Sequence, residues 1–130
     1  LVTIKRVGAI YSKVHALNVV LGDTKPENVL VSPDGKIYLL DFEQASRDGD
    51  KPWDIAEFLY FSGHYLPLDG EFKAEAITKA LISGYLEACG DINIIKKAGS
   101  VKYTRVFGIF TLPSILRVMS EVCKKQGRLD

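Results

Sequence analysis

The stretch that decides the fold of this 130-residue chain is Gly22-Asp23-Thr24-Lys25-Pro26-Glu27-Asn28, followed after a short apolar hairpin by Leu40-Asp41-Phe42. The runs 29–31 and 37–40 are β-branched or apolar, and Ser32-Pro33-Asp34-Gly35 between them is a strong turn signal. A tight turn centred on Asp34-Gly35 predicts that Asn28 and Asp41 face each other at the open end of the hairpin. Asp23 lies one short loop earlier, so three oxygen-bearing side chains are expected to converge. Hard oxygen ligands of this kind suit Mg²⁺ rather than zinc.

The same residues carry a family resemblance. Asp23-x-Lys25-Pro26-x-Asn28 resembles the H-R-D-x-K-P-x-N catalytic loop of protein kinases, and Asp41-Phe42 resembles the start of their D-F-G motif. Residues 13–20 resemble the helix and turn that lead into that loop, so the match covers about residues 3–60. The resemblance implies an α+β, mainly helical fold: a protein kinase-like C-terminal lobe with a catalytic-loop β-hairpin.

Site roles follow from the resemblance. Asp23 is the expected catalytic carboxylate, which orients an acceptor hydroxyl, and Lys25 places a positive charge on the γ-phosphate of ATP. Asn28 and Asp41 are expected to hold the Mg²⁺ ions that bridge the phosphates. Asp54 is expected to support the catalytic loop from the start of the next long helix. Taken singly, each residue also fits a bland role as a turn cap, a solvated lysine or a helix N-terminal acid; the joint spacing favours the functional one.

Three departures separate the chain from regulated protein kinases. Leu21-Gly22 replaces the usual His-Arg, so switching by activation-loop phosphorylation is not expected. The interval from Asp41 to Asp54 leaves no room for a long activation segment. Glu43 replaces the glycine of D-F-G and adds a third acid near the expected metals. The pattern is closer to the atypical kinases, which include RIO-type kinases, the KEOPS-complex kinase, lipopolysaccharide-core kinases and aminoglycoside phosphotransferases.

Helical periodicity outlines the rest of the chain. Helices are expected over 3–17, 53–62, 71–88 and 101–125, the last interrupted near Pro113, with a loop over 43–52 and a break over 63–70. Residues 1–130 are read as a single kinase-like C-terminal lobe. The chain starts at Leu1 rather than Met, and the catalytic loop begins only about twenty residues in. We therefore expect a fragment whose N-terminal lobe is absent.

Composition narrows the function classes. A hydrophobic content of 47%, a charged content of 25% and a net charge of +1 are typical of a globular protein with no general attraction to nucleic acid or membranes. Cys89 and Cys123 lack metal or disulfide spacing, which favours reduced thiols and a cytoplasmic location. His15 and His64 are interpreted as packing residues.

The sequence thus predicts the catalytic lobe of an ATP- and Mg²⁺-dependent phosphotransferase with a hydroxyl acceptor, expected to be Ser/Thr of a protein. Two alternatives stay open: a pseudokinase or solitary C-lobe that binds a partner, and a small-molecule kinase of the aminoglycoside or sugar type. Because the adenine pocket of this family lies between two lobes, the piece alone is expected to be weak or inactive. It is also expected to bind its missing lobe or to self-associate.

Overall fold

The fold is α+β and mainly helical, as the sequence predicts. The computed structural model describes residues 1–127. In chain order the elements of this part are α1 (Val2–Ala16), β1 (Val19–Val20), η1 (Pro26–Asn28), β2 (Val29–Val31), β3 (Ile37–Leu39), β4 (Ser46–Arg47), α2 (Lys51–His64), α3 (Glu71–Ala88), α4 (Ile92–Ala98), α5 (Val101–Phe107), η2 (Gly108–Phe110) and α6 (Pro113–Lys124). None of these helices has both the length and the apolar character needed to cross a bilayer.

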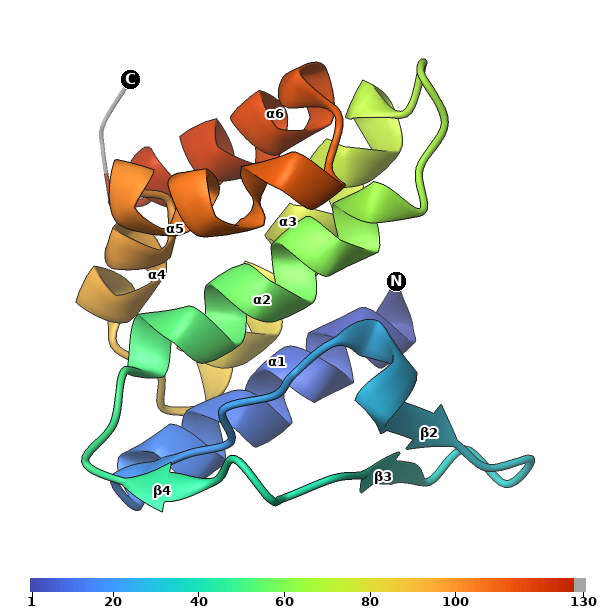
Figure 1. Cartoon of the computed structure of the whole chain (residues 1–130). Helices are drawn as coiled ribbons and strands as arrows, with labels where there is room; N and C mark the ends of the chain where they lie inside the picture. Colours follow the sequence, from blue (N-terminus) through green and yellow to red (C-terminus); the bar gives the residue numbers. More distant parts are fainter. Residues whose placement is uncertain (128–130) are drawn as a thin grey trace.

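Helix α2 is the centre of the core. Ile55, Leu59 and Tyr60 are fully buried, and the helix is apolar on nearly all sides, as expected for a helix enclosed by others. Figure 1 shows α1 on one side of α2 and α5 and α6 on the other. A buried polar group on α2 must therefore find a partner inside the protein.

Helices α1 and α3 approach each other closely, and two glycines make this possible. A Cβ atom on Gly8 would lie 2.2 Å from the backbone oxygen of Leu81, and one on Gly84 would lie 1.7 Å from that of Lys5. Both distances are far below van der Waals contact, so no larger residue fits at either position without moving a helix.

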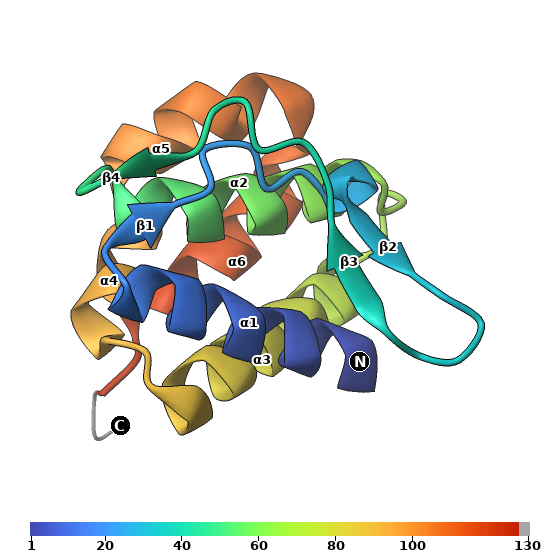
Figure 2. The same cartoon turned by 90° about the horizontal axis from the view of Figure 1, so that it is seen from below.

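Strands β2 and β3 form an antiparallel hairpin that projects from the helices (Figure 2). Its turn is a three-residue loop: the Gly35 amide donates to Ser32 O at 2.9 Å, the Ser32 amide donates to Lys36 O at 2.9 Å, and Gly35 has φ of +86°. A β-turn followed by a left-handed glycine is a common hairpin connection.

This loop changes the predicted register. Val29 pairs with Leu39, and the Leu40 amide donates to Asn28 O at 2.8 Å, so Asn28 lies opposite Leu40. The prediction that Asn28 directly faces Asp41 was therefore wrong by one residue, because it assumed a two-residue turn.

Two further elements differ from expectation. The segment expected to be a loop over 43–52 contains β4, which pairs antiparallel with β1 and places Val19 opposite Arg47. Helix α4 was not expected; Asp91 caps its N-terminus by accepting a hydrogen bond from the Asn93 amide at 2.8 Å. The pairing of β1 with β4 brings together the two ends of segment 21–45, which contains the loop that carries Asp23.

Candidate functional site

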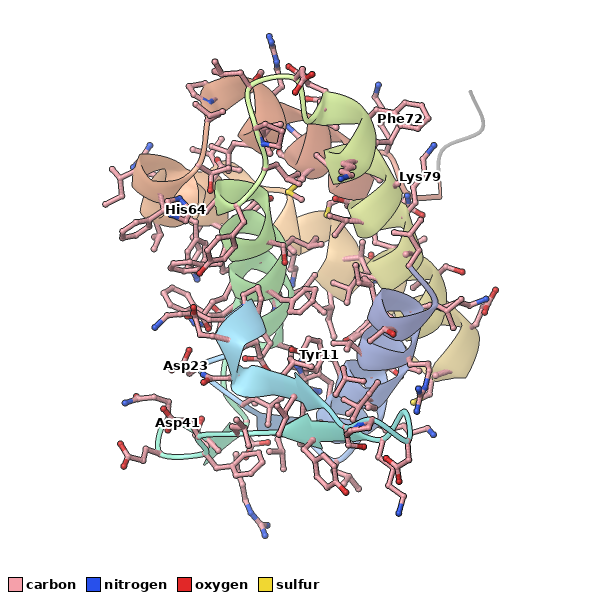
Figure 3. The ribbon with its side chains drawn as sticks, turned by 90° about the vertical axis from the view of Figure 1, so that its right-hand side faces the viewer. Tyr11, Asp23, Asp41, His64, Phe72 and Lys79 are labelled. Carbon is pink, nitrogen blue, oxygen red and sulfur yellow. The ribbon has the colours of Figure 1, made fainter. Side chains whose placement is uncertain are left out.

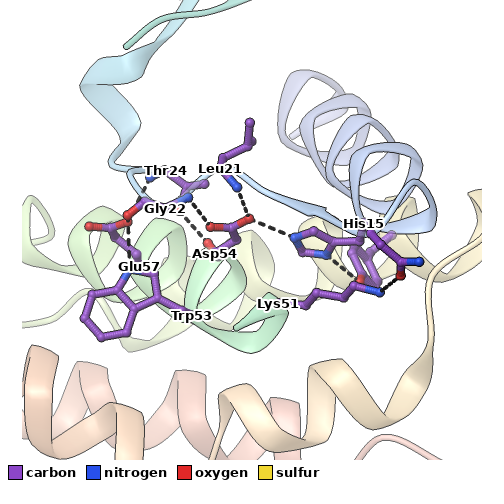
Figure 4. Close-up of polar contacts among 10 residues, drawn as sticks. His15, Leu21, Gly22, Thr24, Lys51, Trp53, Asp54 and Glu57 are labelled. Carbon is purple, nitrogen blue, oxygen red and sulfur yellow. Dashed lines mark hydrogen bonds and ion pairs between the residues drawn. The ribbon is translucent and has the colours of Figure 1, made fainter. Parts of the chain in front are cut away.

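The loop that carries Asp23 is fastened to α2 by one carboxylate. Asp54 is fully buried in the first turn of α2, and its two oxygens accept hydrogen bonds from the amides of Leu21 and Gly22, both at 2.8 Å (Figure 4). Gly22 has φ of +82°, and a Cβ there would lie 2.4 Å from Gln44 O. The chain can make this turn only with a residue that lacks a side chain. Asp54 thus lies under the loop and away from its open side.

A second contact links the same carboxylate to α1 and α3. His15 Nε2 lies 2.8 Å from Asp54 Oδ2, and His15 Nδ1 lies 2.7 Å from the Tyr85 hydroxyl. Burial raises the pKa of the Tyr85 phenol, so the phenol keeps its proton and can donate it to Nδ1. With a proton on Nε2, the ring donates to Asp54 and accepts from the Tyr85 phenol, so all three groups are hydrogen-bonded. His15 is a packing residue in this arrangement, because both of its nitrogens are occupied.

Three more side chains of α2 and the loop complete the anchoring. The backbone amide of Thr24 donates to Glu57 Oε1 at 2.8 Å, and the Thr24 hydroxyl donates to the backbone oxygen of Asp54 at 2.5 Å. Trp53 Nε1 donates to Gly22 O at 3.2 Å (Figure 4). Burial raises the pKa of Glu57, and the neighbouring Asp23 and Asp54 charges add to the rise.

Sequence reasoning missed Glu57 and Thr24. A signal did exist: Glu57 follows Asp54 by three positions, so both carboxylates share one face of α2.

The proposed chemical groups meet on the open side of the loop. Asp23, Asn28 and Asp41 line one small pocket between the loop and the end of the hairpin. Figure 3 shows Asp23 and Asp41 at the same edge of the molecule, with Tyr11 of α1 further in and His64, Phe72 and Lys79 away from them. The three residues are grouped despite the shift in register.

Each group has a defined local contact. Lys25 Nζ lies 3.7 Å from Asp23 Oδ1 and 5.7 Å from the centre of the Phe61 ring. The Asn28 side-chain amide donates to the backbone oxygen of Asp23 at 3.2 Å. Asp41 is exposed and has φ of +63°, a left-handed conformation that Asp tolerates better than most residues, and its Oδ1 accepts from the Glu43 amide at 3.4 Å. Glu43 itself does not line the pocket.

The oxygen donors of the pocket fit a metal ion that arrives with other ligands. Asn28 uses its Nδ2 as a donor, which leaves its Oδ1 available, and Asp41 adds an exposed carboxylate. Within residues 1–127 no group of three or more His, Cys, Asp or Glu side chains is placed to hold a metal on its own. Mg²⁺ commonly takes only one or two carboxylates and completes its shell with water and phosphate oxygens. The donor set therefore suits Mg²⁺ bound to a phosphorylated ligand.

Comparison with known proteins gives no matching family model, no matching curated protein and no matching solved structure. The chemistry of this pocket therefore rests on its own residues.

Proposed function

We propose that this chain is the kinase-like catalytic lobe of an ATP- and Mg²⁺-dependent phosphotransferase that moves the γ-phosphate of ATP to a hydroxyl group, with Ser/Thr of a protein as the acceptor. The observation that supports this proposal is the shared pocket of Asp23, Asn28 and Asp41. Its carboxylate-bearing loop is held by hydrogen bonds that the loop amides donate to the buried carboxylates of Asp54 and Glu57 in α2. Rigid positioning matters because phosphoryl transfer depends mainly on alignment and charge neutralisation.

Each residue has a distinct task in this reaction. Asp23 accepts a hydrogen bond from the acceptor hydroxyl and aligns its oxygen for in-line attack. It takes the proton as the new P–O bond forms and the bond between the γ-phosphate and the departing ADP breaks. Lys25, 3.7 Å from the Asp23 carboxylate, supplies positive charge where the transferred group becomes more negative. Asn28 and Asp41 would hold Mg²⁺, which neutralises charge on the phosphate oxygens. Asp54 acts through the loop and does not touch the substrate.

The test is transfer of label from γ-labelled ATP in the presence of Mg²⁺, with the intact gene product beside its Asp23→Asn variant. Asp69→Asn is the matched control, because Asp69 is an exposed loop carboxylate outside the pocket. We expect label on the protein or an added acceptor, lost in Asp23→Asn and kept in Asp69→Asn. Equal transfer by both variants would remove Asp23 from the mechanism. No transfer and no binding of Mg-ATP by the wild type would refute the enzyme.

A second candidate, a partner-binding module, is favoured by one surface. Leu30, Tyr38, Leu40 and Phe42 of the hairpin and its continuation are each between 43% and 55% exposed. Exposed apolar side chains of this size commonly mark a contact surface. The same surface serves the first proposal if a further lobe covers it, and ATP binding separates the two, since a pure docking module does not need the pocket.

A further inference from the structure

The pocket beside Asp23 contains two buried oxygen atoms that make no hydrogen bond. Across residues 1–127, the buried side-chain oxygens or nitrogens without a partner are Tyr11 Oη and Asp23 Oδ1. Both residues line the same pocket, although they come from α1 and from the loop. Lys25 Nζ, at 3.7 Å from Asp23 Oδ1, is too distant for a hydrogen bond. Because burying an unpaired polar atom is costly, one small ligand between these two residues would satisfy both atoms.

The chemistry of the two atoms is complementary. Tyr11 has no exposed surface, and burial, together with the negative charges of Asp54 and Glu57, raises the pKa of its phenol. The phenol therefore stays protonated and offers a donor, while the Asp23 carboxylate offers an acceptor. A ligand that accepts from one and donates to the other satisfies both, and water does this.

The size of the cavity agrees with this chemistry. About 10 Å³ of the pocket is open to the centre of a water molecule, which is about the space that one water needs. An organic ligand does not fit in that volume, so the phosphates of the proposed reaction would lie outside it, on the exposed side of Asp41. Within that volume, an anion without a metal ion is disfavoured by the carboxylates of Asp23 and Asp41.

We propose that one buried water joins Tyr11 Oη to Asp23 Oδ1 and makes Tyr11 a positioning residue for the Asp23 carboxylate. The water accepts a hydrogen bond from the phenol and donates one to Oδ1, which fixes the orientation of the Asp23 carboxylate. Oδ2 is then left for an incoming hydroxyl. Only this last consequence rests on the proposed function; the water site and its effect on folding do not depend on catalysis.

The test is a double-mutant cycle on thermal unfolding with Tyr11→Phe and Asp23→Ala. If the water joins the two residues, Tyr11→Phe lowers the Tm by roughly 2–6 °C, the effect of one lost buried hydrogen bond, and by less than half as much in the Asp23→Ala background. Tyr60→Phe is the matched control, because the Tyr60 hydroxyl is buried elsewhere and donates to Ala98 O at 2.8 Å. Its effect should be the same in both backgrounds.

The opposite outcome is equally distinct. If the Tyr11 hydroxyl makes no hydrogen bond, its burial destabilises the fold, and Tyr11→Phe, which removes it, would raise the Tm. That result, or an equal loss of Tm in both backgrounds, overturns the proposal. Should a variant not fold, a high-resolution crystal structure of the wild type decides. A water within about 3.2 Å of both oxygens supports the site. An empty cavity, a metal ion or a direct contact between the two residues overturns it.

Kinetics add a separate arm. If the chain transfers phosphate, Tyr11→Phe should lower kcat and leave the KM for ATP unchanged, because the water positions Asp23 and does not bind nucleotide. An equal change in both constants, or none in kcat, contradicts the positioning role. Absence of transfer in the wild type would refute the proposed function and leave the thermal and crystallographic results standing.

Discussion

Replacing Asp54 by Asn should detach the loop from α2 while changing the volume of the side chain very little. Asp54 accepts three hydrogen bonds, from the amides of Leu21 and Gly22 and from His15 Nε2, each at 2.8 Å. An amide has one accepting oxygen, and its NH₂ group would face at least one of these donors. At least one buried donor would then lose its partner, in a place that no solvent reaches.

The size of the loss follows from these contacts. Leaving a buried donor without its partner costs about 1–3 kcal/mol, which is a noticeable part of the stability of a domain of this size. Near the Tm, that loss corresponds to a decrease of roughly 4–12 °C for a chain of this length. Thermal and urea unfolding, followed by circular dichroism, measure it directly.

Amide hydrogen exchange gives the local readout. The Leu21 and Gly22 amides should lose protection in Asp54→Asn by a larger factor than amides of α6, which lies away from the loop. Tyr85→Phe is the graded control, since it removes only the hydrogen bond on the far nitrogen of His15. A loss under about 1 kcal/mol, or unchanged protection of the two amides, would refute the role given to Asp54.

Three further predictions concern other parts of the molecule. Burial raises the pKa of Glu57 above the ordinary carboxyl value of 4.5, so the contribution of Glu57 to stability falls as the pH rises above that value. The Tm of Glu57→Gln should therefore increase relative to that of the wild type as the pH increases from about 4. Parallel curves of Tm against pH would contradict this. Gly84→Ala should lose about 3 kcal/mol, because its methyl group would lie 1.7 Å from Lys5 O, although Ala favours helices; Ser83→Ala next to it should change stability by less than about 0.5 kcal/mol in denaturant unfolding. In the intact gene product, Asp41→Ala should weaken Mg²⁺-dependent binding of ATP at least tenfold in calorimetry and leave the Tm almost unchanged, because Asp41 is exposed.

Local patterns explain which parts of the fold could be predicted. Helix α3 runs over Glu71–Ala88, the range that its periodicity predicts between Gly70 and Gly90. The hairpin was predicted correctly, but its register was not, because Ser-Pro-Asp-Gly fits both a two-residue and a three-residue loop. The pairing of β1 with β4 was missed because two-residue strands carry no periodic signal and meet only through the tertiary fold.

The candidate site divides in the same way. Asp23, Asn28 and Asp41 line one pocket because short spacing and one hairpin bring them together, although the predicted register was wrong by one residue. Glu57 and Tyr11 were missed because both positions look like ordinary helix residues in the sequence. Glu57 matters because it is buried and accepts a hydrogen bond from the loop, and Tyr11 matters because its buried hydroxyl makes no hydrogen bond. Both features depend on how α1 and α2 pack against the loop.

The crossing of α1 and α3 sets more than the stability of the bundle. Gly84 is adjacent to Tyr85, and Gly8 is on the same helix as His15. The separation of α1 and α3 therefore sets the distance between the Tyr85 hydroxyl and the His15 imidazole. A single added methyl group would push the two helices apart. It would thereby displace the hydrogen-bonded residues Tyr85, His15 and Asp54, which hold the loop. Substitutions at either glycine would therefore change the geometry of the pocket without replacing any residue that lines it.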